Sequence, residues 1–298
     1  MVVRIGARGK KEPSQGQLAR TWRSFRRHKL AVASLVFLVV LVTIAALGSR
    51  IMPCDPLKID LKAVPGGKPA APGAAHWLGT DEMGRDVFSR LISGARVSLM
   101  VGLVATGLSL VFGVTLGAVA GFFGGLASSL IMRTADIFLS LPRFFLIMVV
   151  NAYLTPSVYN IMAVIGLFSW MGVARLVRGE FLRLKEQEFI TATKALGVPT
   201  GRVILRHLLP NSVAPIIVAA TLQIPYAILT ESSLSFLGLG IAPPLASWGS
   251  MLNLAKPYIA TAWWLWVPAG VLISLTVFAF NFVGDGLRDA LDPLQHRR

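Results

Sequence analysis

The residue types that most often carry out chemistry are sparse in this chain and form no recognisable catalytic set. Its four histidines are dispersed along the sequence, at His28, His76, His207 and His296. We find no HExxH zinc-peptidase pattern, no GxSxG nucleophile elbow and no group of Ser, His and Asp at a readable catalytic spacing. We therefore expect no catalytic residues, no bound metal and no cofactor.

The sequence also lacks a phosphate-binding loop and the cysteines that a disulfide would need. Gly9-Lys10 and Gly67-Lys68 lack the G-x-x-x-x-G-K-[ST] context of a phosphate loop, so we do not expect the chain to hydrolyse ATP itself. The single cysteine, Cys54, excludes an internal disulfide and has no metal-ligand cluster around it in the sequence. A membrane-embedded enzyme, the alternative, would need acidic or histidine pairs inside apolar segments, and the sequence has almost none.

The composition points instead to a protein that crosses a membrane several times. Of its 298 residues, 54% are hydrophobic and only 14% are charged, whereas soluble domains carry about 25% charged residues. A formal net charge of +15 can indicate nucleic-acid binding. Here, however, Lys and Arg lie beside the apolar segments, as the positive-inside rule predicts. We expect a lipid bilayer around the chain and no nucleic-acid partner.

The apolar segments predict six transmembrane helices, at about 31–48, 97–121, 129–152, 160–176, 213–234 and 263–282. A cleaved signal peptide is the alternative for the first, since Ala46-Leu47-Gly48 resembles a cleavage site. We favour an uncleaved span, because the basic region before it is long for a signal. Residues 1–30 carry nine Lys/Arg, so both termini are predicted to be cytoplasmic and residues 49–96 to lie outside.

Two segments are predicted to lie at membrane–water interfaces. Residues 21–30 can form an amphipathic helix that directs three apolar side chains toward lipid, namely Trp22, Phe25 and Leu30. A belt of aromatic residues precedes the last span at the outer interface and consists of Trp263, Trp264 and Trp266. Within the second span, glycines recur every four residues at Gly113, Gly117 and Gly121, which predicts close packing against another helix.

A few ionisable residues fall within or beside the spans. Arg133 and Asp136 are three residues apart and are predicted to pair. Pro142 is expected to kink the third span, and Arg143 follows it directly. A charge there is costly unless it faces a cavity or a partner, so Arg143 is a candidate for the pathway or a subunit interface. Glu231 is expected to snorkel toward water, with a gate or cavity role as the alternative.

The longest segment after the N-terminal third that is too polar to cross a membrane runs over residues 187–211. Two short helices are predicted there. The first is punctuated at Gly197, and the second covers about 202–208 and stops at Pro210. A charged loop between two spans is the plain interpretation. The first helix, however, also carries a surface of small residues suited to close packing with another protein, formed by Ala192, Ala195 and Leu196.

The spacing within this segment resembles the EAA loop of ABC-importer permeases, which reads E-A-A, three residues, G, nine residues, I-x-L-P. Thr191-Ala192-Thr193, Gly197 and Leu209-Pro210 occupy the matching positions, and His207 replaces the usual Ile. In that family the loop is a coupling helix that docks into a cleft on a separate ATPase subunit. The resemblance therefore implies an ATPase contact at Glu188, Thr191, Ala192, Thr193, Ala195, Leu196, Gly197, His207, Leu209 and Pro210.

A second block carries the same resemblance. Residues 76–86, HWLGTDEMGRD, resemble the H-x-L-G-T-D-x-x-G-R-D block of peptide and nickel permeases, and so do the Leu-Gly-Leu-Gly loop at 237–240 and the tail at 284–293. From its alternating charges alone, the block would be a self-neutralised external helix. Because 49–96 and 235–262 are too long for mere turns, we expect them to receive an extracytoplasmic binding protein. Its candidate contacts are Asp81, Arg85 and Asp86.

The sequence thus predicts an all-α polytopic membrane protein with the type I ABC importer permease fold, in a bacterial inner membrane. The resemblance implies the C-type permease subunit of a dipeptide or oligopeptide importer, with nickel or glutathione import as alternatives. It also implies a homologous second permease, two ATPase subunits that bind the ATP, and a substrate-binding protein. A channel, which would need no coupling loop, is disfavoured. The expected divisions are 1–30, 31–48, 49–96, a permease core at 97–285, and a cytoplasmic tail at 286–298.

Overall fold

The protein is almost entirely helical. The computed structural model describes residues 17–64 and 67–291, and within these two ranges its only β-type pairing is an isolated bridge between Thr80 and Asp86. Five of the described helices are long and apolar enough to cross a membrane, or six if one bent helix pair counts as a single span. The predicted class, an all-α polytopic membrane protein, is confirmed.

The described helices alternate between long apolar rods and short connecting elements. In chain order they are α1 Gln17–Arg27, α2 Lys29–Ala46, α3 Gly48–Ile51, the 3-10 turn η1 Leu61–Ala63, α4 Val87–Phe123, α5 Gly125–Ser140, α6 Arg143–Tyr153, α7 Val158–Leu167, α8 Trp170–Lys185, α9 Glu188–Ala195, α10 Thr200–Val203, the π-helical turn η3 Ile204–Leu208, α11 Leu209–Phe236, α12 Trp248–Ala255, the 3-10 turn η4 Lys256–Tyr258, and α13 Trp263–Leu291.

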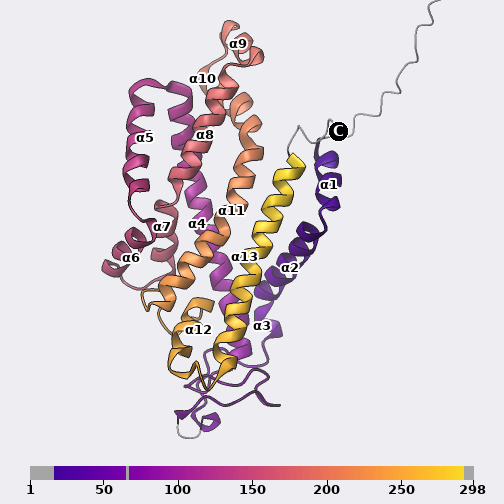
Figure 1. Ribbon diagram of the computed structural model, residues 1–298, viewed down its shortest axis with the longest axis vertical. Coiled ribbons are helices and arrows are strands. Elements are labelled where there is room, and N and C mark those ends of the chain that lie inside the picture. The colour runs from indigo at the N-terminus through magenta and orange to yellow at the C-terminus, as the bar shows by residue number, and fades with distance from the viewer. Residues whose placement is uncertain (1–16, 65–66, 292–298) are drawn as a thin grey trace, which may run out of the picture.

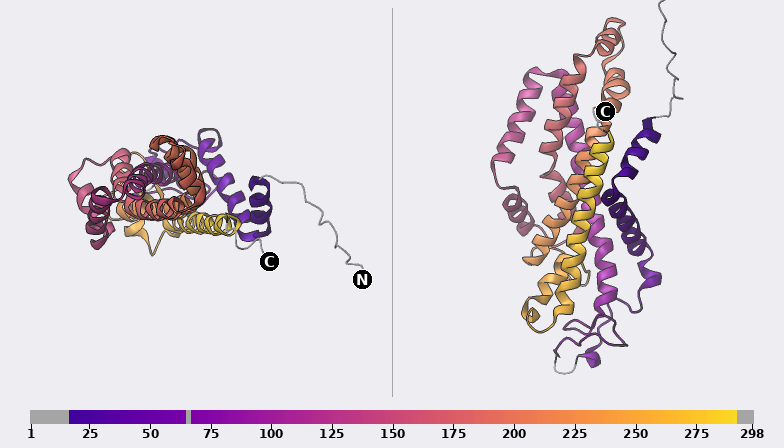
Figure 2. Two further views of the ribbon diagram at one scale, coloured as in Figure 1. Left: turned by 90° about the horizontal axis from the view of Figure 1, so that it is seen from above. Right: turned by 45° about the vertical axis from the view of Figure 1, so that its right-hand side comes forward.

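The long helices form an elongated bundle with two different ends (Figure 1). The short helices α9 and α10 lie beyond the bundle at one end, which we call the α9 end. The loops between α3 and α4 lie with α12 at the other, which we call the α12 end. Helices α1 and α2 pack against α13 on one flank, and α5 and α6 lie on the opposite flank (Figure 2). The two segments for which we predicted contacts with other proteins, 187–211 and 49–96, thus lie at opposite ends of the bundle.

Helix α4 packs closely on α8 through its glycine face. A Cβ atom added at Gly117 would lie 2.6 Å from the carbonyl oxygen of Ala174 and 2.8 Å from Cβ of Val177. Cβ atoms at Gly113 and Gly121 would collide with α8 in the same way. The close helix packing that the glycine spacing predicted is therefore confirmed, and α8 is its partner.

Helix α4 begins ten residues earlier than the sequence predicted. Asp86 is its N-cap, and its Oδ2 accepts a hydrogen bond of 2.8 Å from the backbone N–H of Ser89. The added turns are buried, with Val87 and Leu91 in a core shared with α12 and α13. A capping carboxylate satisfies amide groups that would otherwise lack partners, so the helix can begin within the loops of the α12 end.

Proline has a larger effect in the third predicted span than expected. Instead of kinking one helix, Pro142 separates α5 from α6, and the two axes differ by 88°. The predicted pair of Arg133 with Asp136 is also wrong, because Asp136 forms its ion pair with Arg175 of α8. The fourth predicted span likewise consists of two helices, α7 and α8, which are interrupted at Ser169.

The second helix of the 187–211 segment does not stop at Pro210. The π-helical turn η3 leads directly into α11, where Pro210 lies in the first turn. Because helical structure is continuous from Thr200 to Phe236, the missing N–H of Pro210 falls within a helical path, just after the π-helical turn that makes the local backbone irregular. Pro215 and Pro225 also lie inside α11. Helical structure is thus continuous from α10 at the α9 end through η3 and α11.

Some of the predicted lipid contacts are internal instead. The amphipathic helix expected at 21–30 instead covers 17–27, because the helix breaks at His28 and Leu30 belongs to α2. Within α1, Phe25 is buried and packs where Gly286 of α13 leaves space. Trp22 and Leu30 are exposed, as a lipid-facing position requires. In the aromatic belt only Trp263 is exposed, because Trp264 belongs to the core. Helix α13 continues to Leu291, nine residues past the predicted end of the span.

We predict that Gly117→Ala destabilises the chain, because its new methyl group must push α4 away from α8. Overpacking of this kind costs about 1–3 kcal/mol. The control is Gly107→Ala, where an added Cβ meets nothing within 4 Å. Thermal unfolding of the purified chain in detergent should give a lower Tm for Gly117→Ala only. Equal Tm values for both variants would contradict the packing.

Candidate functional site

The α9 element is built as a small helical hairpin at the end of the bundle. Helix α9 ends in a Schellman-type turn, in which the N–H of Val198 donates to the carbonyl of Thr193 at 3.2 Å. Gly197 provides the left-handed residue of this turn, with φ +72°. Pro199 then caps the N-terminus of α10. The chain thus reverses direction within a few residues and returns to the bundle.

The base of this hairpin is anchored in the protein core. Ile190, Val203 and Leu208 are buried and share a cluster with Phe181 and Leu184 of α8. Burying an aliphatic or aromatic side chain contributes about 1.5–3 kcal/mol each. The hairpin is therefore fixed to the end of α8 and moves with it.

The tip of the hairpin, in contrast, exposes apolar side chains. Leu196, directly after α9, is 81% exposed, and two further apolar side chains, Phe189 at the start of α9 and Leu205 in η3, are exposed nearer the base. Figure 1 shows that α9 lies farther from the bundle than any other labelled helix. An apolar tip on an anchored projection has the form of an element that inserts into a partner's surface.

The predicted contact residues lie on α9 and on the helical segment that returns through α10 and η3 to the first turn of α11. Thr193, His207 and Leu209 are partly buried, and the others are exposed: Glu188, Thr191, Ala192, Ala195, Leu196, Gly197 and Pro210. Both threonine hydroxyls donate within α9, Thr191 to the Gln187 carbonyl and Thr193 to the Ile190 carbonyl. The hydroxyls are therefore occupied within the helix, and the exposed surface available to a partner combines apolar side chains such as Leu196 with polar ones such as Glu188.

Three charged residues of the 76–86 block are internal and the block is not helical, so the alternative of a self-neutralised external helix is wrong. Asp81, Arg85 and Asp86 are each less than a tenth exposed, in a tight turn before α4. Oδ2 of Asp81 lies 2.7 Å from Nε of Arg85 and 3.5 Å from Nε of Arg90. Buried in this way, the three charges hold the turn together and are not free to contact another protein.

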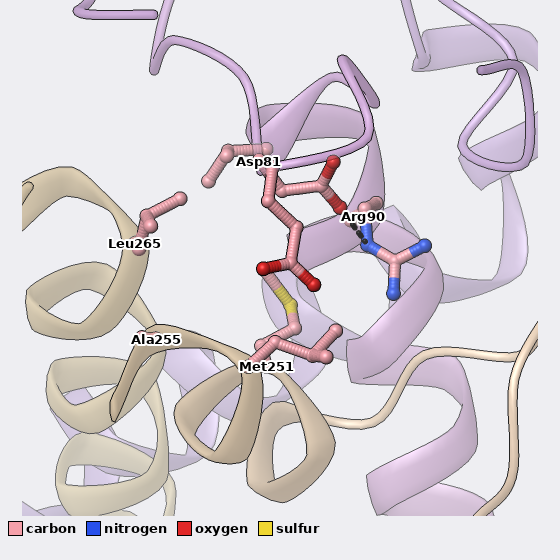
Figure 3. Close-up of a pocket in the computed structure, with 8 residues that line it drawn as sticks. Asp81, Arg90, Met251, Ala255 and Leu265 are labelled. Carbon is pink, nitrogen blue, oxygen red and sulfur yellow. Dashed lines mark ion pairs between the residues drawn. The ribbon is translucent and has the colours of Figure 1, made fainter. Parts of the chain in front are cut away.

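A small pocket adjoins this cluster (Figure 3). Asp81 and Arg90 line one side, and Met251, Ala255 and Leu265 of α12 and α13 line the other. We predicted no role for Arg90, because it is one of several charges of alternating sign in this part of the sequence. Its burial, 2% exposed, is set by the packing of α12 over the start of α4.

A second polar cluster joins the only cysteine to two other side chains. Cys54 follows α3, His76 lies in the loop and Asp86 caps α4, yet one ligand atom from each lies within 4.8 Å of the other two. Nδ1 of His76 is 2.9 Å from Oδ1 of Asp86. The expectation that Cys54 has no potential metal ligands around it is therefore wrong, since the fold brings both neighbours from distant positions.

Glu231 does not snorkel toward water but is fully buried. Its Oε1 accepts a hydrogen bond from the hydroxyl of Ser235 at 2.7 Å, and Ser232 lies near its other oxygen. The end of α11 is covered by α12, whose Gly249 leaves room for the backbone of Ser232. Both serines belong to α11 and satisfy the carboxyl group, and the hydroxyl of Ser247, the N-cap of α12, lies 3.5 Å from that of Ser235, which connects this cluster to α12. A gate role for Glu231 stays a prediction.

Arg143 begins α6 and lies against α11. Its guanidinium is 4.8 Å from the ring centroid of Tyr226, a cation–π distance. The contact joins the bent helix pair to the long helix that follows the α9 hairpin. The prediction that Arg143 lies on the pathway or a subunit interface stays open. Arg143 is partly buried, and its contact within the chain is the ring of Tyr226.

Two buried polar contacts were not anticipated. Gln223 of α11 donates to the carbonyl of Ser169 at 2.9 Å, at the break between α7 and α8. Trp248 of α12 donates from Nε1 to the Leu91 carbonyl at 3.2 Å and is fully buried. A lone amide in an apolar span was a readable signal for Gln223, because such groups need a partner in lipid. Trp248 gave no such signal.

Comparison with known proteins identifies the family. Residues 113–297 match the family described as binding-protein-dependent transport system inner membrane component, and residues 15–69 match the N-terminal TM domain of oligopeptide transport permease C. The chain belongs to this permease family. It is therefore a transport permease and not an enzyme, and family membership places it as a multi-pass protein of the inner membrane.

Similar permeases come from several bacteria. The chain is 42% identical to the dipeptide transport system permease protein of Bacillus subtilis, over 96% of this chain and 89% of the relative. It is 40% identical to the oligopeptide transport system permease protein of the same organism, over 90% and 87%. It is also 40% identical to the glutathione transport system permease protein of Pectobacterium atrosepticum, over 91% and 89%. The predicted resemblance to peptide permeases is confirmed.

We predict that Asp81→Asn strongly destabilises the permease, because Arg85 and Arg90 would lose their shared buried counter-charge. Removing one partner of a buried ion pair costs about 3–5 kcal/mol. Asp55→Asn, an exposed position in the same segment, is the control. Thermal unfolding and the yield of folded chain should fall for Asp81→Asn alone. Unchanged unfolding in both variants would show that the cluster contributes nothing to stability.

Proposed function

We propose that this permease forms half of the translocation pore of an ATP-driven, binding-protein-dependent importer, and that α9 transmits the action of separate ATPase subunits. The observation that carries the proposal is the α9 hairpin, which has an anchored base and an exposed apolar tip. Its residues are those for which the EAA-like spacing implied an ATPase contact. The matched family, whose description names binding-protein-dependent transport, supports the same assignment.

The proposed orientation places the α9 end in the cytoplasm, together with both termini. Exposed basic side chains gather there, including Arg206 after α10 and Arg26 on α1. Charges of both signs occupy the loops of the α12 end, for example Asp55 and Lys58, and Trp263 is exposed near them. The positive-inside rule and the interfacial preference of tryptophan favour this orientation.

The proposed partners are a homologous second permease, two ATPase subunits that bind the ATP, and an extracytoplasmic substrate-binding protein. Because Asp81, Arg85 and Asp86 are internal, we now assign the binding-protein contact to exposed side chains of the same segment. Leu57, Ile59, Leu61 and Trp77 form the apolar part of that surface. The buried cluster would hold this surface in place without touching the partner.

A dipeptide or oligopeptide is the proposed substrate. Dipeptide and oligopeptide permeases are among the similar relatives, and the glutathione permease transports a compound that is itself a peptide. Uptake into proteoliposomes that contain the complete transporter tests the proposal, with labelled dipeptide, glutathione and nickel compared in parallel. ATP-dependent uptake of dipeptide is expected. Uptake of nickel alone would overturn the substrate assignment.

The geometry suggests how the ATPases would drive the pore. A push on the α9 tip moves its base, and that base is packed on α8 while the chain continues through η3 into α11. Helix α8 in turn is held against the glycine face of α4. Closure of the ATPases would therefore move several long helices as a unit, a rigid-body change that switches access from one side of the membrane to the other.

We predict that Ala192→Trp and Gly197→Val uncouple the permease from its ATPases. The tryptophan would overfill a contact made by a small exposed residue, and valine is strained at φ +72°. Gly201→Ala is the control, since an added Cβ there meets nothing and its φ is not positive. Co-purification of the ATPase and transport in vesicles should fall for the first two variants and not for the control. Normal coupling in all three would refute the assignment of α9.

The orientation can be tested by labelling single cysteines. In a Cys54→Ser background, Lys68→Cys should react with a membrane-impermeant maleimide in intact cells, because residue 68 is exposed at the α12 end. Leu196→Cys should react only after the membrane is opened. The opposite pattern would invert the proposed topology, and external reaction of both would exclude a membrane between the two ends.

A further inference from the structure

Three segments of the chain bring one thiol, one imidazole and one carboxylate together at the α12 end. Cys54 lies just after α3, His76 comes from the long loop and Asp86 is the N-cap of α4. One potential ligand atom from each lies within 4.8 Å of the others. The transport function proposed above assigns no role to Cys54 or His76 and uses Asp86 only to hold a loop surface in place, so the convergence of the three side chains requires its own explanation.

The three groups are a donor set that suits a zinc-class ion. Zinc binds thiolate sulfur at about 2.3 Å and imidazole nitrogen or carboxylate oxygen at about 2.0–2.2 Å. On a tetrahedral ion these lengths separate the ligand atoms by about 3.3–3.6 Å. The His76 to Asp86 distance of 2.9 Å must open by a few tenths of an ångström, and the Cys54 sulfur, which lies within 4.8 Å of the other two ligand atoms, must approach them by up to about 1.2 Å. Both changes are within the reach of side-chain adjustment.

The surroundings hold the ligands in position and leave access from solvent. Oδ2 of Asp86 accepts the capping hydrogen bond from Ser89, which leaves Oδ1 directed at His76. The backbone N–H of Cys54 lies 3.3 Å from the Ser89 hydroxyl, so the same residue orients both ligands. The His76 side chain is 20% exposed, and Cys54 is partly exposed. An ion can therefore enter without disturbing the core.

We propose that Cys54, His76 and Asp86 form a binding site for one zinc-class divalent cation, with a fourth position open to water. On binding, the Cys54 thiol gives its proton to solvent and the sulfur binds as thiolate, while His76 binds as the neutral imidazole through Nδ1 with its proton on Nε2, and Asp86 binds as the carboxylate. Bound there, it ties the loop between α3 and α4 to the start of α4 at three points. The site would stabilise this loop in its folded position, as structural metal ions do elsewhere.

The test uses the fact that Cys54 is the only cysteine in the chain. The full-length permease, purified in detergent and treated with chelator, is reacted with a maleimide in the presence of increasing Zn²⁺. Bound zinc should slow alkylation of Cys54 in the unmodified chain. His76→Gln should weaken this protection by at least about 10-fold, the smallest effect usual for residues that support a metal site.

Asp86→Asn and Asp55→Asn form a matched pair for the carboxylate. Asn caps helices about as well as Asp, so Asp86→Asn keeps the start of α4 but removes a charged ligand. It should weaken zinc protection by a similar factor, whereas Asp55→Asn, one residue after the thiol and exposed, should leave it unchanged. Bound zinc, measured after desalting, should be one per chain and should be lost in Cys54→Ser.

Two results would overturn the proposal. The first is an alkylation rate that Zn²⁺ does not change in the unmodified chain. The second is equal protection in the unmodified chain and in His76→Gln, because zinc would then bind the thiol without the site. Neither result bears on the coupling role of α9, so this proposal can fail while the proposed transport function stands.

Discussion

The contact on which the arrangement most depends is the direct packing of the α4 glycine face against α8. Because Gly113, Gly117 and Gly121 lack side chains, the α8 backbone approaches within a distance that no other residue would permit. Helix α8 ends in the buried cluster that anchors the α9 hairpin. Helix α4 begins at the capped, charge-bearing turn of the α12 end. This contact thus connects both ends of the molecule, where the candidate contacts with the ATPase and the binding protein lie.

The two ends use polar and apolar groups in opposite ways. At the α9 end, apolar side chains such as Leu196 are exposed while the base is buried, which is the pattern of a surface that a partner covers. At the α12 end, charges are drawn inside: Asp81 holds two arginines, and Glu231 is enclosed by serines. Unpaired charge is costly away from water, so such clusters fix loop positions. We infer a rigid outer platform and a coupling tip that depends on its partners.

Local patterns in the sequence predicted the features that depend on neighbouring residues. Apolar length gave the positions of the long helices, glycine spacing gave the packing face of α4, and the EAA-like spacing located the α9 hairpin. Features that depend on distant residues could not be read. The partner of Asp136 is thirty-nine positions away in Arg175, and burial of Glu231 depends on α12 folding back over α11. Cys54 likewise gains His76 only through the path of the loop. Pro142 predicted a kink within one helix but not the 88° angle between two separate helices.

The most direct measurement of the central claim is cross-linking from the α9 tip in the assembled transporter. Leu196→Cys, in a Cys54→Ser background, would carry a short photoactivatable cross-linker, with Leu61→Cys at the α12 end as the comparison. Both positions are highly exposed, at 81% and 71%. The account predicts that Leu196→Cys links to the ATPase subunit, and that the extent of linking changes when ATP is added. Linking of the ATPase from Leu61→Cys, or none from Leu196→Cys, would contradict it.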